Sequence, residues 1–237
     1  MQNLPLRRLR PEDPPEAFPD PARALREPDG LLAVGGDLSP ERLLYAYAHG
    51  IFPWYDAGLP ILLWSPDPRA VFLPDALHVS RSLGRRMRRG GYQIRFDTAF
   101  DEVMAGCAGP RPQYPEGGTW INPEMKQAYV RLHHLGYAHS VELWQDGVLA
   151  GGLYGVAVGR VFFGESMFSR VTDASKVVLV TLMRHLQRWG YAFMDCQVQS
   201  GHLESMGSVP VPRPDFLNML ATLCIEPVSG HAWRPEP

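Results

Sequence analysis

The sequence predicts an α+β fold in which a small unit precedes a larger part built around a mixed sheet. Residues 139–198 read as a strand hairpin, then a helix, then a strand, an order typical of α+β or mixed-sheet architecture. Before them, two aromatic-proline clusters, Ile51–Tyr55 and Ile61–Pro68, flank a loop and indicate a small, rigid N-terminal unit. We therefore expect a small domain at 1–67 and a larger domain at 68–237.

The N-terminal unit begins with a proline-rich stretch, residues 1–30, which reads as an extended lead-in. Ser39 suits a helix N-cap, Pro40 suits the first helical position, and Gly50 suits the end of the helix. A helix is therefore expected over residues 40–49.

In the larger part, alternating apolar residues predict strands, and apolar residues spaced three or four apart predict helices. The expected elements, in chain order, are a strand at 70–73, a helix at 80–89, a strand at 93–96, a helix at 99–105, a loop at 106–118, a helix at 123–135, strands at 139–144, 149–158 and 160–164, a helix at 173–189, a strand at 192–198 and a helix at 215–220.

The composition excludes several classes of protein. Hydrophobic residues make up 45% of the chain and charged residues 20%, which is typical of a globular protein. Apolar runs such as Val177–Met183 are too short to span a bilayer, and the N-terminus has no apolar signal core, so we expect a cytoplasmic protein. The three cysteines form no CxxC pair, and His133 and His134 are adjacent, so neither a metal nor a cofactor is expected.

Residues 81–95 contain six arginines and no acid, although the net charge of the whole chain is −2. A basic block in a nearly neutral protein is a candidate phosphate-binding surface. The alternative is an ordinary solvated helix face.

Two polar positions stand out in apolar surroundings. Glu165 follows a hydrophobic strand, where a carboxylate is costly to bury unless it meets a cation or a hydrogen-bond donor. Asp195 and Gln197 are two residues apart on an expected strand, so they would share a face, with Cys196 on the opposite one. A carboxylate beside an amide can hold an amine or accept its proton. The alternatives are that Glu165 is an exposed loop acid and that Asp195 and Gln197 are strand-end polar groups paired with the backbone.

Apolar and aromatic residues near these positions suggest binding surfaces. Trp54 and Trp120 lie in expected loops, where an indole is available to stack on a nucleobase or to cap the core. Four further residues either line an apolar side-chain pocket or pack in the core: Leu153, Phe162, Met167 and Met194.

Ten short motifs then occur in a characteristic order. They are Leu32–Leu38, Gly50–Trp54, Trp64–Arg69, His78–Ser82, Gly118–Ile121, Ala138–Glu142, Gly151–Val156, Gly164–Ser169, Ala174–Lys176 and Asp195–Gln197. From about residue 30 to 220 the chain resembles the leucyl/phenylalanyl-tRNA–protein transferases, bacterial enzymes of the N-degron pathway.

The resemblance implies an acetyltransferase-like (GNAT-like) larger domain. It also implies transfer of Leu or Phe, and less well Met, from aminoacyl-tRNA to proteins that begin with Arg or Lys, which marks them for degradation. By position, Trp54 and Trp120 match tryptophans near the terminal adenosine. The other matches are acceptor-stem contacts (Arg81, Arg88 and Arg89), the aminoacyl pocket (Leu153, Phe162, Met167 and Met194) and the polar catalytic set (Glu165, Asp195 and Gln197). A monomer is expected.

The chain departs from the family pattern at a few places. The loop at Arg111–Glu116 is longer than usual, which would alter access to the site. Leu153 stands where some relatives have Met, which would retune the preference between Leu and Phe.

The implied reaction is attack of an amine on an ester that the tRNA has already activated. We expect Asp195, acting with Gln197, to hold the amine and help remove its proton, and Glu165 to orient the donor's amino group or the acceptor. Three alternatives remain at this point: a tRNA-dependent transferase with another amine acceptor, a non-catalytic RNA-binding protein and an acyl-CoA N-acyltransferase. The last is disfavoured because residues 165–172 lack the glycine-rich turn that binds a pyrophosphate.

Overall fold

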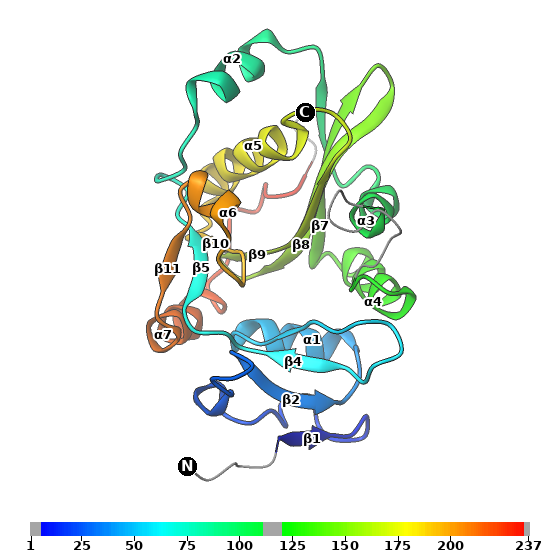
Figure 1. The fold of residues 1–237 in the computed structure, drawn as a ribbon, viewed down its shortest axis with the longest axis vertical. Helices are drawn as coiled ribbons and strands as arrows, with labels where there is room; N and C mark the ends of the chain where they lie inside the picture. Colours follow the sequence, from blue (N-terminus) through cyan, green and yellow to red (C-terminus); the bar gives the residue numbers. More distant parts are fainter. Residues whose placement is uncertain (1–5, 111–119, 235–237) are drawn as a thin grey trace.

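The computed structural model describes residues 6–110 and 120–234 (Figure 1). Up to residue 110 the elements are β1 (Arg7–Leu9), the 3₁₀ helix η1 (Pro21–Arg23), β2 (Leu31–Gly35), α1 (Pro40–Ala48), β3 (Phe52–Pro53), β4 (Leu62–Trp64), β5 (Arg69–Phe72), α2 (Arg81–Arg89), β6 (Gln93–Phe96) and α3 (Phe100–Ala108). After residue 119 they are α4 (Pro123–His134), β7 (Ala138–Gln145), β8 (Val148–Val158), β9 (Val161–Ser169), α5 (Ala174–Trp189), β10 (Phe193–Asp195), α6 (Gly201–Ser205), β11 (Val209–Val211) and α7 (Arg213–Leu223). None of the helices in these two ranges is long and apolar enough to cross a membrane. The predicted long loop at Arg111–Glu116 lies outside the described residues.

Four short strands form a small N-terminal sheet in the order β1-β2-β4-β3. The predicted helix at 40–49 is confirmed as α1, which lies between this sheet and the rest of the molecule (Figure 1). Ala46 of α1 packs with the core of the small sheet, whereas Tyr47 packs with the core of the larger part. The strands themselves were not predicted, because none is longer than five residues and alternation cannot be recognised over so short a run.

The proline-rich lead-in is held in place by a buried arginine. The guanidinium of Arg42, on α1, is 2% exposed and donates hydrogen bonds to the backbone carbonyls of residues 10, 11, 13 and 14. It also pairs with the carboxylate of Asp37 at 3.2 Å. Because the carbonyls of an extended segment have no strand partners, this one side chain satisfies several of them at once.

Seven strands form the main sheet, in the order β11-β5-β10-β9-β8-β7-β6. β10 runs parallel to β9 and the other neighbours are antiparallel, so the predicted mixed sheet is confirmed. Helix α5 packs on one face, with α2 beyond it, and α3 and α4 pack on the other (Figure 1). Strand β8 touches both layers: a Cβ on Gly151 would meet Ala174 of α5, and one on Gly152 would meet Val103 of α3.

The predicted helices and central strands are found with small shifts at their ends, but two strands near the polar motifs differ. β9 continues to Ser169, so Glu165 lies within a strand rather than after one. β10 ends at Asp195, three residues earlier than expected. Helix α6 and strand β11 were not predicted. β11 includes Pro210 and pairs with β5 at the sheet edge, where a proline is tolerated.

Candidate active site

Glu165 lies at an irregularity in the pairing of β8 with β9. Tyr154 pairs with Ser166, and Gly155 pairs with Gly164, so Glu165 is the extra residue of a β-bulge. A Cβ on Gly155 would collide with the carbonyl oxygen of Phe163, so this stretch needs glycine. Bulges bend a strand, redirect a side chain and are frequent beside active sites. The bulge therefore sets the direction of the Glu165 carboxylate.

Three hydrogen-bond donors converge on that carboxylate. The hydroxyl of Tyr47, from α1, donates to Oε1 at 2.8 Å, and the hydroxyl of Tyr129, from α4, donates to Oε2 at 3.0 Å. The two tyrosine hydroxyls also contact each other. The side-chain amide of Gln197 donates to Oε1 at 3.2 Å. The carboxylate is thus held by residues from the N-terminal helix, from α4 and from the end of β10.

The protonation of this cluster follows from its burial. Burial raises the pKa of Glu165 from about 4.5 to about 7, the nearby Asp195 carboxylate adds to the rise, and the two tyrosines and Arg69 oppose it. Burial likewise raises the pKa of Tyr47 and Tyr129 well above its usual value, so both hydroxyls stay protonated and can donate. A carboxyl group that titrates near neutral pH is suited to exchanging a proton during a reaction.

Asp195 is occupied by a buried ion pair. Arg69, the first residue of β5, donates from Nε to Oδ1 at 2.8 Å and from Nη2 to Oδ2 at 2.9 Å, and both side chains are at most 1% exposed. The Nη1 group of Arg69 donates to the carbonyl of Gly50 at 2.8 Å. Its guanidinium also lies 4.9 Å from the ring centroid of Phe52 and 4.8 Å from that of Phe216. Asp195 is therefore anchored in the interior.

Asp195 and Gln197 do not share a strand face as predicted. Because β10 ends at Asp195 and Gln197 adopts a positive φ of 59°, the i, i+2 rule does not apply. Instead, the backbone N–H of Gln197 donates to Oδ1 of Asp195 at 3.0 Å, and its side chain reaches Glu165. Cys196, expected on the opposite face, lines the same pocket as Gln197. Asp195 thus fixes the backbone from which Gln197 extends.

A pocket of about 270 Å³ opens beside Glu165 and Gln197. This is slightly smaller than the pockets that hold drug-sized ligands, and is suited to a single side chain. Its polar residues are Glu165, Ser166, Cys196, Gln197, Ser200 and His202, and its other residues are Trp120, Leu153, Gly164, Met167, Leu179, Met194 and Leu203. Among the described residues, no three His, Cys, Asp or Glu side chains are grouped so as to hold a metal.

Of the four apolar residues expected at the aminoacyl pocket, three line the pocket and one does not. Leu153, Met167 and Met194 line it. Phe162 does not: it is fully buried, and its ring packs against Trp233 at a centroid distance of 5.3 Å. On β9, Phe162 and Met167 lie on either side of the bulge at Glu165, so strand alternation alone could not relate their directions.

The two tryptophans lie in different settings. Trp120 lines the pocket and is partly buried against the core. Trp54 is outside the set of lining residues, is 46% exposed and packs against Trp64 at a centroid distance of 5.7 Å. Its indole is accessible, and stacking on a base stays a prediction for it.

Among the residues of this region that were not predicted from the sequence are Arg69, Tyr47, Tyr129, Ser166, Leu179, Ser200, His202 and Leu203. Leu179 comes from an apolar helical stretch that looks like ordinary core sequence, whereas Leu203 lies in the short polar helix α6, which was not predicted. Arg69 gave a usable signal, because a charged residue that begins a buried strand requires a buried partner, and Asp195 is such a partner.

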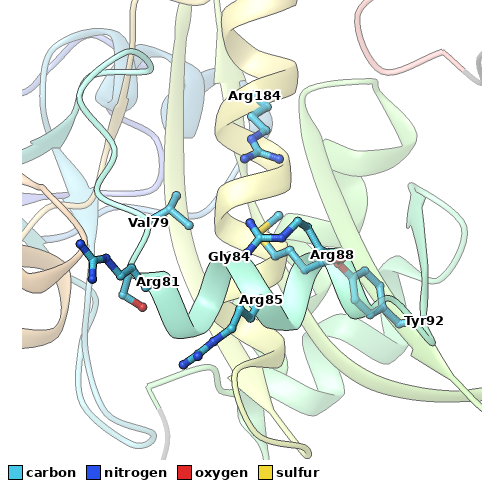
Figure 2. A pocket seen from close by; sticks show the side chains of 9 residues that line it. Val79, Arg81, Gly84, Arg85, Arg88, Tyr92 and Arg184 are labelled. Carbon is cyan, nitrogen blue, oxygen red and sulfur yellow. The ribbon is translucent and has the colours of Figure 1, made fainter.

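Of the predicted nucleic-acid contacts, Arg81 and Arg88 line a second pocket, of about 720 Å³, between α2 and α5 (Figure 2). Arg89 is exposed on the same helix but is not among the lining residues. Five of the six arginines of the basic block thus lie on α2, and Arg95 lies on β6. Helix α2 begins with Ser80 as N-cap, whose hydroxyl accepts a hydrogen bond from the N–H of Leu83.

Comparison with known proteins identifies the family of this chain. The family model for leucyl/phenylalanyl-tRNA protein transferase matches residues 71–221, and the model for the N-terminal domain of the same enzyme matches residues 36–67. The chain belongs to this family. It is therefore an aminoacyltransferase that acts with aminoacyl-tRNA and protein substrates.

Individual relatives match over nearly their full length. The leucyl/phenylalanyl-tRNA–protein transferase of Stutzerimonas stutzeri is 61% identical over 92% of this chain and 95% of the relative. That of Aromatoleum aromaticum is 58% identical over 92% of each chain.

Solved structures align partially. A GCN5-related N-acetyltransferase from Kribbella flavida aligns over 73% of this chain and 61% of its own, with 13% identity and a TM-score of 0.38. The L-PGS structure from Bacillus licheniformis aligns over 78% of this chain and 70% of its own, with 12% identity and a TM-score of 0.44. These likenesses concern the fold and carry no information on activity.

Replacing Glu165 by Gln should change how stability depends on pH. Between pH 4.5 and pH 7 the folded state holds a proton on Glu165 that the unfolded state has released, so the wild type loses stability as the pH rises through this window. The loss is at most ~3 kcal/mol, from about 1.4 kcal/mol per pKa unit. Glu165→Gln lacks this dependence. Urea unfolding at several pH values measures it, with exposed Glu12→Gln as control. The assignment is wrong if the wild type and Glu165→Gln lose stability equally across the window.

Asp195→Ala should lower the free energy of unfolding by ~3–5 kcal/mol, because it leaves the Arg69 guanidinium buried without its counter-charge. The double variant Arg69→Met/Asp195→Leu should recover part of the loss, since it removes both buried charges. Chemical denaturation measures both, with exposed Asp75→Ala as the matched control. A single variant as stable as the control would show that the ion pair does not support the fold.

Proposed function

We propose that this enzyme transfers Leu or Phe, and less well Met, from aminoacyl-tRNA to the N-terminal amine of proteins that begin with Arg or Lys, as a mark for N-degron degradation. Family membership supports the transferase reaction, and the resemblance supports these acceptors. The observation that supports the proposal best is the polar pair of Glu165 and Gln197 at an apolar pocket sized for one side chain.

In the proposed arrangement the donor's Leu or Phe side chain enters the apolar pocket. Leu153, Met167, Leu179 and Met194 provide apolar walls, so burial of the side chain supplies binding energy of ~1.5–3 kcal/mol. Trp120, at the same pocket, would stack on the terminal adenosine, and Trp54 would contact a base outside it. The α2 arginines Arg81, Arg88 and Arg89 would contact phosphates of the RNA.

The chemical step is attack of the acceptor's neutral α-amine on the ester carbonyl carbon. An amide bond forms, the ester bond breaks, and the ribose oxygen of the terminal adenosine leaves with a proton. An α-amino group has a pKa of ~7.7–8.0, so part of it is already neutral in the cell. Correct positioning supplies much of the acceleration, up to ~7–11 kcal/mol in well-oriented cases.

The geometry favours a division of roles that differs from the one expected from the sequence. Gln197 and Glu165 line the pocket, so the amide would hold the incoming amine and the carboxylate, with its pKa of about 7, would accept the proton. Asp195 is fully buried against Arg69 and would act as a positioning residue through the backbone N–H of Gln197. The negative charge of Glu165 would also attract a cationic Arg or Lys acceptor.

The deciding experiment is a transfer assay with charged leucyl-, phenylalanyl- and methionyl-tRNA. Peptides that begin with Arg or Lys should gain the amino acid, peptides that begin with Ala or Glu should not, and RNase should abolish the signal. Transfer to a different amine in an acceptor panel would favour the alternative tRNA-dependent transferase. An acyl-CoA donor is disfavoured, since the link from β9 to α5, Arg170–Asp173, contains no glycine to bind a pyrophosphate.

We also propose that the enzyme is a monomer and works in the cytoplasm.

Gln197→Ala should lower kcat at least ~10-fold while leaving the Kd for charged tRNA nearly unchanged, because the amide acts on the acceptor amine rather than on the RNA. Single-turnover transfer and filter binding measure the two quantities. Gln187→Ala, an exposed amide on α5, is the matched control. A Gln197→Ala variant with unchanged kcat would exclude this role.

A further inference from the structure

The groove between α2 and α5 contains an arginine that lies far from the basic block in the sequence. Arg81, Arg85 and Arg88 come from α2, whereas Arg184 comes from α5, and all four line the groove (Figure 2). Figure 2 shows the Arg184 side chain on α5, the helix that α2 crosses, extending toward the guanidinium of Arg88, whereas Arg81 and Arg85 extend from other sides of α2. The groove is thus basic on both sides.

Within the described part of the chain, the four arginines of this groove have no counter-charge. All four are exposed, and none forms an ion pair with any described residue. No acid lines the groove. By contrast, Arg42, Arg69 and Arg160 each pair with an Asp or Glu. A concave surface with several uncompensated guanidinium groups attracts phosphate, which arginine can bind with two parallel hydrogen bonds.

A glycine in the middle of α2 keeps the groove open. Gly84 lines it and carries no side chain, although glycine costs about 1 kcal/mol relative to alanine inside a helix. The guanidinium of Arg88 extends back over this position, with Nη1 3.4 Å from where a Cβ would lie. A longer side chain at 84 would therefore compete with Arg88 for the space that faces Arg184.

The same helix that supplies Arg184 also lines the aminoacyl pocket. Leu179 of α5 is a pocket residue, and Arg184 follows five residues later, which is about 7.5 Å along a helix axis. An RNA whose 3′ end carries its amino acid into the pocket would pass this part of α5. The groove is therefore placed to meet the phosphates close to that end.

We infer that Arg184 binds a backbone phosphate of the donor RNA, held between α5 and the arginines of α2. The inference rests on the proposed function and extends it, because it adds a residue from a second helix to the RNA contacts. No covalent chemistry is involved: the groove orients the RNA, and Arg184 is a binding residue.

The test compares Arg184→Ala and Arg184→Glu with the wild type in binding to leucyl-tRNA over about 50 to 200 mM salt. Arg184→Ala should raise Kd roughly 2- to 5-fold, the effect of one exposed charged contact. It should also reduce the slope of log K against log salt by about 0.7–0.9, the loss of one phosphate contact. Arg184→Glu should weaken binding further. Arg131→Ala removes an exposed charge on the opposite side of the main sheet and is the matched control.

A second readout separates RNA binding from pocket structure. In transfer assays Arg184→Ala should raise KM for leucyl-tRNA but leave KM for leucyl-adenosine, which lacks the RNA backbone, unchanged. An equal rise for both donors would overturn the inference, as would a Kd and salt slope equal to those of Arg131→Ala. Binding to anionic lipid vesicles in place of tRNA, abolished in Arg184→Glu, would overturn it too. If the wild type itself does not transfer leucine from leucyl-tRNA, the proposed function is wrong. If the wild type transfers leucine and the Arg184 variants bind and transfer as well as the wild type, only the inference about Arg184 is wrong.

Discussion

The candidate site depends on one buried ion pair. Arg69 and Asp195 are removed from water almost completely, so the charges are tolerated only because each is fully matched. Arg69 uses its three donor groups on the Asp195 carboxylate and the Gly50 carbonyl, and two aromatic rings cover its guanidinium. The pair thereby joins β5, β10, α7 and the turn after α1 at one point. Removing one partner would leave a charge in a medium that cannot solvate it.

The rest of the polar cluster follows from that anchor. Asp195 accepts the backbone N–H of Gln197, Gln197 donates to Glu165, and Glu165 is held from its other side by Tyr47 and Tyr129. Because these groups are buried, water is not available as an alternative hydrogen-bond partner for them. The cluster is therefore fixed by hydrogen bonds at several points, while the walls of the pocket beside it include leucine and methionine side chains, of which methionine adapts most readily to different apolar groups.

Local features of the sequence were sufficient for much of the fold. The cap and proline at the start of α1, the apolar alternation of β7 and the apolar run of β8 are each signals within one element, and all three elements were found. The pocket residues Glu165, Gln197 and Trp120 also came from motifs. The partners of the buried charged groups could not be recognised from motifs, because Tyr47 is 118 positions from Glu165 and Arg69 is 126 positions from Asp195. Only the folded chain pairs such groups. The bulge at Glu165 was missed for a related reason: a register shift belongs to two strands together.

The position of Tyr47 has a consequence for synthesis of the protein. This residue belongs to the first helix, whereas Gln197 follows the tenth strand, and both bind the same carboxylate. During translation the ribosome releases the helix long before the last part of the cluster exists. A nascent chain, or one truncated before Gln197, would therefore lack part of the polar cluster even though its first helix is complete.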